Sequence, residues 1–182
     1  EDLLYKIFGI NAELLIDHAW GWEPCTIADI KAYKPETNSI GSGQVLHCAY
    51  DYDKTRLVVR EMTDILVLDL VDKGLVADQV VLTVGYDIDN LTNPDIRRKY
   101  KGEVTTDRYG RQVPKHAHGT ANLSRPTSST RLITEAVMEL YDRIVNPNLL
   151  IRRLNLTANH VVSEQSAQKK EIYEQLTLFT DY

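Results

Sequence analysis

The sequence of 182 residues is long enough for one domain of ordinary size, or for one domain with appendages. Its composition, 43% apolar and 26% charged, is typical of a globular protein and excludes an intrinsically disordered chain. No apolar run approaches the roughly 20 residues of a membrane-spanning helix. The acidic, amphipathic first residues lead us to expect no secretory signal. Cys25 and Cys48 match no metal or redox spacing, so we expect ordinary thiols in a reducing compartment, by default the cytoplasm.

The net charge of −5 is unevenly distributed along the chain. Residues 1–96 carry 7 Lys or Arg against 17 Asp or Glu, whereas residues 97–153 carry 12 against 5, with His116 and His118 in addition. An acidic chain with one basic third predicts a local surface for a polyanion. The alternative is a solvated loop that is rich in lysine and arginine.

Two short helices are predicted at the start of the chain. Apolar residues recur at helical spacing on both sides of Gly9, which ends the first helix. These helices alone cannot bury a core, so we expect the chain to begin within a domain. Residues 20–39, which include Pro24 and Pro35, are predicted to be irregular.

The pattern after residue 40 predicts the order strand, helix, strand, strand, helix, strand. The expected elements are a strand over 41–52 with a flexible Gly-Ser-Gly entry at 41–43, a helix over 54–72 capped by Asp53, strands over 80–87 and 115–123, a helix from 128–130 to 144, and a strand over 149–162. A polar, basic connection spans 88–114. This order is the split βαβ arrangement, so the predicted fold class is α+β, with a four-stranded antiparallel sheet and two helices on one face. We expect the other face to be open to a partner, with the basic connection beside it.

Three stretches, by their order and spacing, resemble the C-terminal part of Y-family (translesion, DinB/UmuC-like) DNA polymerases. FGINAELLIDHAWG resembles the last helices of the thumb, and NSIG, from Asn38 to Gly41, is similar to the linker that follows the thumb. HGTANLSRPTSSTRLITEAV resembles the third strand and second helix of the little finger domain. The resemblance implies a helical thumb remnant over 1–36, a linker over 37–43, a little finger domain over 44–163 and a flexible tail over 164–182.

The sequence departs from the family pattern at three points. Asn38 stands where the linker usually has a basic residue, and the connection over 88–114 is much longer than in typical members. That form is closest to the UV-damage repair branch of Gram-positive bacteria. The palm, whose carboxylates hold two metal ions in these polymerases, has no counterpart here. We therefore expect a C-terminal piece with no catalytic residues and no cofactor, the magnesium belonging to the absent palm of the parent enzyme.

The resemblance implies that the domain grips the backbones of primer–template DNA, including damaged DNA, without reading its sequence. Such contacts need cations, hydroxyl groups and backbone amides at small residues. The residues predicted to bind DNA are Ser39, Gly41, Arg108, Arg111, Lys115, His116, His118, Gly119, Thr120 and Arg131.

Two other functions remain open at this point. His116 and His118 are one residue apart on a predicted strand, so they face the same side and could be metal ligands, with Asp107 as a third. That reading is a small metal-dependent hydrolase. The other is an interaction domain whose open sheet face binds protein.

The end of the chain, Gln175-Leu176-Thr177-Leu178-Phe179, resembles the bacterial sliding-clamp-binding motif. The resemblance implies that Gln175, Leu176, Leu178 and Phe179 bind the clamp, with Gln175 hydrogen-bonded at a pocket rim and the Leu178-Phe179 pair in an apolar cleft. Burial of the Leu-Phe pair could contribute roughly 3–6 kcal/mol before ordering costs. The alternative is a last strand or helical turn that packs on its own domain. The expected partners are thus DNA and the sliding clamp, and no membrane.

Overall fold

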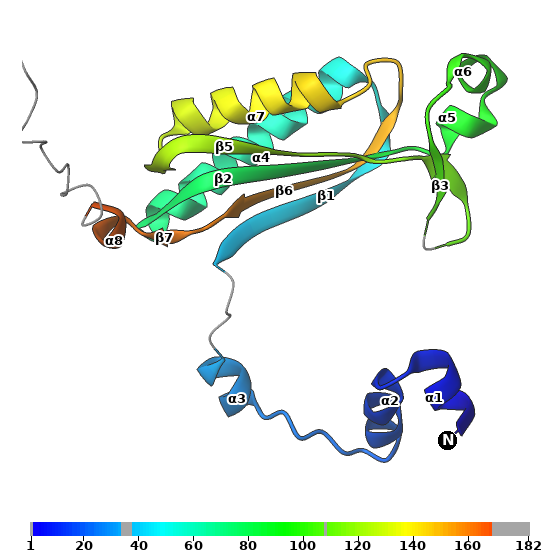
Figure 1. Cartoon of the computed structure of the whole chain (residues 1–182), viewed down its shortest axis with the longest axis vertical. Coiled ribbons are helices and arrows are strands. Elements are labelled where there is room, and N and C mark those ends of the chain that lie inside the picture. The colour runs from blue at the N-terminus through cyan, green and yellow to red at the C-terminus, as the bar shows by residue number, and fades with distance from the viewer. Residues whose placement is uncertain (1, 34–37, 108, 169–182) are drawn as a thin grey trace, which may run out of the picture. The chain divides into compact units, whose positions relative to one another are not determined.

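The structure, a computed structural model, describes residues 2–33, 38–107 and 109–168, and the chain divides into two units, residues 1–36 and 37–182. The first unit holds three short helices, α1 (Asp2–Phe8), α2 (Asn11–Ala19) and α3 (Ile27–Ala32) (Figure 1). Ala12 is the one residue that is buried in the described part of this unit, so these helices enclose no core of their own. None of the helices that the structure describes is long and apolar enough to cross a membrane.

Helix α3 corrects the prediction that residues 20–39 are irregular. Thr26 and Asp29 form a capping box: the backbone N–H of Asp29 donates to Thr26 Oγ1 at 3.3 Å, and that of Thr26 donates to Asp29 Oδ2 at 2.9 Å. This reciprocal pair satisfies two of the backbone donors that a helix start leaves unpaired. Pro24 precedes the cap and does not interrupt the helix.

The second unit is built on one antiparallel sheet. Its long strands are β1 (Ser39–Tyr50), β2 (Leu75–Tyr86), β5 (Ala117–Thr127) and β6 (Ile151–Asn159), in the spatial order β1-β6-β2-β5. Helices α4 (Tyr52–Asp72) and α7 (Thr130–Ile144) lie together on one side of it (Figure 1). The short strand β7 (Val162–Ser163) pairs with the start of β2 and is followed by α8 (Glu164–Gln168). The predicted α+β class is confirmed.

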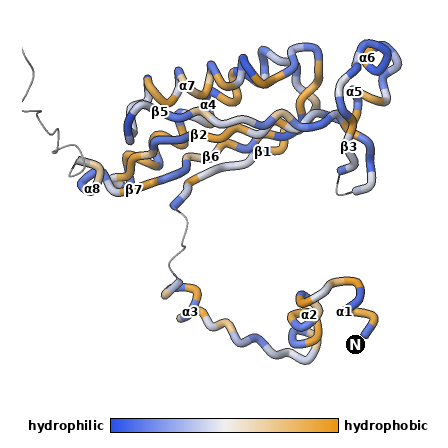
Figure 2. The backbone as a smooth tube through the Cα atoms, viewed as in Figure 1, coloured by the Kyte–Doolittle hydropathy of each residue, from blue (hydrophilic) through white to orange (hydrophobic). Residues whose placement is uncertain are grey.

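The core lies between the sheet and the two helices. Val80, Leu82 and Val84 of β2 are fully buried, and so are Leu154 and Leu156 of β6. Because side chains alternate along a strand, the intervening residues face the other side. Figure 2 colours the strands by hydropathy, and along β6 apolar residues alternate with polar ones from Leu154 to Asn159. The helices complete the core with the buried residues Val59, Met62, Leu66, Leu70, Ile133, Val137, Leu140 and Tyr141.

Strand β1 begins at Ser39, so residues 39–43 of the predicted linker are paired in the sheet. Pairing with β6 holds the Gly-Ser-Gly stretch in the sheet, with Gly41 opposite Thr157. A Cβ atom on Gly41 would lie 2.7 Å from Thr157 Oγ1 and 3.0 Å from the carbonyl oxygen of Leu156. The glycine therefore permits a close approach of β1 to β6.

The connection over 88–114 is also more ordered than the sequence indicates. It contains α5 (Asp89–Thr92), α6 (Pro94–Lys99) and a hairpin of β3 (Val104–Thr106) and β4 (Gln112–Pro114). The fully buried Asn90 fixes its start to the loop before β6. Its side-chain amide donates to the carbonyl of Leu150 at 2.7 Å, and the backbone N–H of Leu150 donates to Asn90 Oδ1 at 2.7 Å.

Helices α4 and α7 are joined at the surface by a carboxylate that accepts three hydrogen bonds. Asp142 accepts from Tyr52 Oη at 2.6 Å and from Arg56 Nε and Nη2 at 2.8 and 3.0 Å. The hydrogen bonds from Arg56 lower the pKa of Asp142. Burial, together with the hydrogen bond to Asp142, raises the pKa of Tyr52 to about 12.

We expect Asp142→Asn to lower the free energy of unfolding by about 1 kcal/mol at pH 7, the low figure reflecting an ion pair that is partly exposed to solvent. Because the pKa of Asp142 is lower in the folded state, this stabilisation is complete above about pH 4 and is lost as the pH falls through the folded-state pKa. Urea unfolding of both proteins at a series of pH values from 7 downward measures this difference in the free energy of unfolding. The control Asp64→Asn, at an exposed position of α4 that forms no ion pair within the described chain, should change it by less than about 0.5 kcal/mol. A pH-independent effect of Asp142→Asn would contradict the assignment.

Candidate nucleic-acid interface

The face of the sheet opposite α4 and α7 is lined by small polar side chains. Strand pairing brings the outward-facing residues into rows that run across β1, β6, β2 and β5. The rows are Ser39, Asn159, Gln79 and Asn122; Gly41, Thr157, Val81 and Thr120; Gly43, Asn155, Thr83 and His118; and, on three strands, Val45, Arg153 and Gly85. We call these residues the open face. Most are hydroxyl, amide or glycine residues, and none is a carboxylate.

Side-chain hydrogen bonds orient the amides of the open face. Asn159 Nδ2 donates to Gln79 Oε1 at 3.0 Å, and Gln79 Nε2 donates to Asn122 Oδ1 at 2.9 Å, so one chain of amides crosses three strands. Thr83 Oγ1 and His118 Nδ1 are hydrogen-bonded at 2.9 Å. A carboxamide has two donor hydrogens and a hydroxyl has one donor and two acceptor sites, so these groups retain capacity for a ligand.

Two arginines add positive charge to this surface. Arg153 is exposed in the last row and forms no ion pair with any residue that the structure describes. Arg143 extends from α7 to the edge strand β5, where its Nη2 donates to the carbonyl oxygen of Thr120 at 3.0 Å. The open face is therefore neutral to positive, which suits a polyanion.

The structure brings Ser39, Gly41, His118 and Thr120 together on the open face, among the residues predicted to bind DNA. Arg108 lies outside the described residues. His116 precedes β5 and lies at the end of the sheet, beside the hairpin.

Two predicted cations are neutralised by partners on the hairpin. Arg111 Nη2 lies 2.7 Å from Asp107 Oδ2, and Lys115 Nζ lies 2.7 Å from Glu103 Oε2. Hydrogen bonds from the side chain and backbone of Arg111 lower the pKa of Asp107, which keeps this carboxylate charged. The two pairs reduce the positive charge that the sequence assigned to this segment.

Gly119 and Arg131 lie away from the open face. A Cβ atom on Gly119 would come within 2.9 Å of both Leu140 Cδ1 and Ile144 Cγ2, so packing beneath α7 accounts for this glycine. Arg131 is in the first turn of α7, on the helical side of the sheet, with Nη1 at 3.6 Å from Glu135 Oε1.

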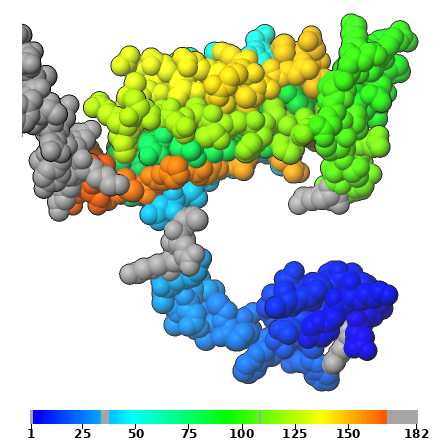
Figure 3. Space-filling model, viewed as in Figure 1, coloured from blue at the N-terminus to red at the C-terminus, as the bar shows by residue number. Residues whose placement is uncertain are grey.

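The basic connection is divided between the two sides of the sheet. Figures 1 and 3 show α5 and α6 at one end of the sheet on the side of α4 and α7, whereas the β3–β4 hairpin projects to the other side. The expectation that the basic connection lies beside the open face is therefore wrong for residues 97–101. These cations lie in or directly after α6, on the side of α4 and α7.

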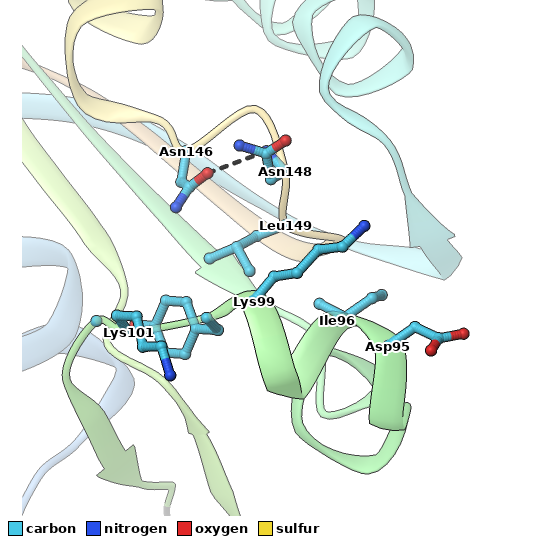
Figure 4. A pocket seen from close by; sticks show the side chains of 9 residues that line it. Asp95, Ile96, Lys99, Lys101, Asn146, Asn148 and Leu149 are labelled. Carbon is cyan, nitrogen blue, oxygen red and sulfur yellow. Dashed lines mark hydrogen bonds between the residues drawn. The ribbon is translucent and has the colours of Figure 1, made fainter.

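A hollow of about 550 Å³ lies between α6 and the turn after α7, lined by residues that include Lys99, Lys101 and Leu149. In Figure 4 the side chains of Lys99 and Lys101 extend in different directions, so their ammonium groups do not converge on one anion. The turn is held by Asn146, whose Oδ1 accepts from the backbone N–H of Asn148 at 3.0 Å.

The sequence reasoning missed much of the open face. The missed residues are Gly43, Val45, Gln79, Val81, Thr83, Gly85, Asn122, Arg153, Asn155, Thr157 and Asn159. A signal for part of this set was present, because polar residues alternate with Leu154, Leu156 and Ala158 along β6. Such alternation indicates a polar face, whereas the register that aligns it with β2 comes from the fold.

Among the described residues, the metal-site alternative lacks a third ligand. The rings of His116 and His118 are 6.5 Å apart between centroids, and Asp107 is engaged by Arg111. Within residues 2–33, 38–107 and 109–168, no three His, Cys, Asp or Glu side chains are grouped as a metal site requires.

Residues 37–171 match the model of the impB/mucB/samB family C-terminal domain. The match covers most of the chain, and the chain belongs to this family. Residues 37–171 of its second unit are thus a C-terminal domain of the impB/mucB/samB family, which confirms the resemblance to Y-family polymerases at the level of the family.

Solved structures that the chain matches include a complex of a β-clamp processivity factor with the little finger domain of PolIV, at 9% identity and a TM-score of 0.44 over 79% of this chain and 100% of that one. Another is a Y-family DNA polymerase chimera of Dbh and Dpo4, at 12% identity and a TM-score of 0.46. The similarity covers 90% of this chain and 39% of the chimera. No curated protein sequence matches the chain. Both likenesses are distant, and the family assignment rests on the sequence match.

Proposed function

We propose that the chain is the DNA-holding C-terminal part of a translesion DNA polymerase, of the form found in the UV-damage repair branch of Gram-positive bacteria. Its open face lies along the backbones of the primer–template duplex, damaged or intact. The observation that carries the proposal is the composition of that face, which presents hydroxyls, amides and glycines, with Arg153 beside them and no carboxylate.

The short side chains of the open face explain why binding would be indifferent to sequence. Phosphate oxygens accept hydrogen bonds from neutral donors such as Asn155 and Thr157, and these contacts carry no base information. Reading a base requires a side chain that reaches its edge in a groove. Gly41 and Gly43 keep the β1 side of the surface low, so a backbone can approach it. A domain of this kind would tolerate any template, including a damaged one.

The ion pairs of the hairpin make the electrostatic part of this binding smaller than the sequence predicts. Each phosphate that a free cation neutralises contributes about 0.9 to the slope of log affinity against log salt. Arg111 and Lys115 are already paired with carboxylates, whereas Arg153 on the face and Arg143 at its edge form no ion pair with described residues. Neutral hydrogen bonds then supply a large share of the affinity. Phosphoryl transfer itself would belong to another part of the parent enzyme.

We expect Arg153→Ala to weaken the binding of the 182-residue chain to a duplex of arbitrary sequence by about tenfold, because a charge-assisted hydrogen bond to phosphate is lost. The salt slope should fall by about 1. Fluorescence anisotropy at several salt concentrations measures both quantities.

The matched control is Arg60→Ala, at an exposed position of α4 that forms no ion pair with described residues and lies on the helical side. It should leave both the affinity and the slope unchanged. An equal loss in the two variants would show that DNA does not bind the open face.

The tail is the second part of the proposal. Gln175, Leu176, Leu178 and Phe179 lie outside the described residues, and their resemblance to the clamp-binding motif supports a tether to the sliding clamp. The joint variant Leu178→Ala with Phe179→Ala should reduce binding to a bacterial sliding clamp at least about 100-fold, because two buried apolar side chains are removed. Surface plasmon resonance with immobilised clamp measures the loss.

The pair Ile172→Ala with Tyr173→Ala, just before the motif, is a control of similar size and should retain clamp binding. Clamp binding that survives the loss of Leu178 and Phe179 would assign it to another surface. If the tail instead packs on its own domain, the joint variant Leu178→Ala with Phe179→Ala would lower the free energy of unfolding.

A further inference from the structure

A cavity of about 790 Å³ lies at one end of the open face, in the corner between the sheet and the β3–β4 hairpin. Its sheet side is formed by open-face residues that include Thr83, Arg153 and Asn155, and its hairpin side includes Tyr109 and Val113. We call it the corner cavity. Because it shares residues with the open face, a DNA strand that leaves that face at this end would enter the cavity directly.

A bulge in β6 places two arginines at the corner cavity. Gly85 pairs with Arg153 and Tyr86 pairs with Ile151, so Arg152 is an extra residue on β6. Adjacent residues of a regular strand point to opposite faces, and a bulge changes these directions. Arg152 and Arg153 therefore both line the cavity although they are adjacent in sequence. Arg152 Nε lies 3.8 Å from Asp87 Oδ2, whereas Arg153 forms no ion pair with the described residues. His116 lines the same cavity.

The side chain of Asp107 holds the backbone of Tyr109 and Arg111 beside the corner cavity. Asp107 Oδ1 accepts from the backbone N–H groups of Tyr109 and Arg111, both at 2.9 Å. The Arg111 guanidinium lies 5.0 Å from the centroid of the Tyr109 ring. The Tyr109 side chain is 61% exposed to solvent. Exposed aromatic rings beside cations are the usual platforms for unpaired bases.

We propose that the corner cavity takes one unpaired nucleotide of the single-stranded DNA that adjoins the duplex. The base stacks on Tyr109, and its phosphate is held by Arg153 and His116. The volume lies within the 300–1,000 Å³ that is usual for small-molecule sites and is ample for one nucleotide. Asp87, Asp89 and Asp107 also line the cavity, but Arg111 engages Asp107 and Arg152 lies beside Asp87, which offsets much of their charge.

This inference rests on the proposed function, and it adds a preference that the open face alone would not give. A base inside a duplex has its faces covered by neighbouring bases and cannot stack on Tyr109. An unpaired base at the junction has a free face. The corner cavity would therefore make the chain prefer a duplex that continues into a single strand over a blunt duplex.

The test compares a blunt duplex with a duplex of the same paired length that carries a single-stranded 5′ overhang, by fluorescence anisotropy with the 182-residue chain. The parent chain should bind the overhang substrate at least about fivefold more tightly. Tyr109→Ala should abolish this preference and leave the affinity for the blunt duplex unchanged, whereas Tyr109→Phe should retain it. With 2-aminopurine at the first unpaired position, the parent chain and Tyr109→Phe should change the fluorescence, and Tyr109→Ala should not.

The outcomes separate this inference from the function on which it rests. Binding of the blunt duplex without a preference for the overhang would overturn the corner cavity and leave the open face as the duplex site. The same conclusion follows if Tyr109→Ala weakens both substrates equally, or if Tyr109→Phe behaves like Tyr109→Ala. Failure of the parent chain to bind even the blunt duplex would overturn both proposals.

Discussion

The burial of one side of β6 is the constraint on which the rest of the second unit depends. Leu154, Leu156 and Ala158 are fully buried against the helical layer, while β1 and β2 pair with the strand on its two edges. Since side chains alternate with a period of two, this burial fixes the opposite direction for the polar residues between them. A register shift of one residue would bury the polar set and expose the leucines, at a large cost in free energy. The open face is therefore a consequence of the core.

The two sides of the sheet use small residues for different ends. On the helical side Gly119 lets α7 approach β5, and on the open side Gly41 lets β1 approach β6. The cations also differ in their surroundings. Arg111 and Lys115 form ion pairs with Asp107 and Glu103, whereas Arg153, at the end of the open face, forms none with the described residues. The result is a surface of neutral donors with few free cations. Such a surface can follow a phosphate backbone while remaining indifferent to the bases.

The sequence was sufficient to predict the fold class because its patterns are local. Val80, Leu82 and Val84 alternate with less buried residues, and the apolar stripe of α7 recurs at helical spacing, so strand and helix could be distinguished. Helix α3 could also have been predicted, since Thr26 and Asp29 have the spacing of a capping box. The glycines at the start of β1 misled the prediction, because pairing with β6 outweighs their low strand propensity.

The site was less predictable because it depends on contacts between distant segments. The ion pair of Lys115 with Glu103 exists because the hairpin brings its two ends together, and no local pattern shows this. Gly119 was predicted to contact DNA because it is small, but only the position of α7 shows which side of the sheet it serves. The row that joins Asn159, Gln79 and Asn122 likewise combines three strands whose register the sequence does not give.

The central claim is that DNA lies on the side of the sheet that the helices leave uncovered. Amide chemical-shift mapping by NMR, with the 182-residue chain titrated with a short duplex, tests this claim most directly. The account predicts that the largest shifts fall on Gly41, Thr83, Thr120 and Asn155, with little change along the exposed side of α4. Shifts concentrated on α4 and α7, with the strand amides unchanged, would contradict it.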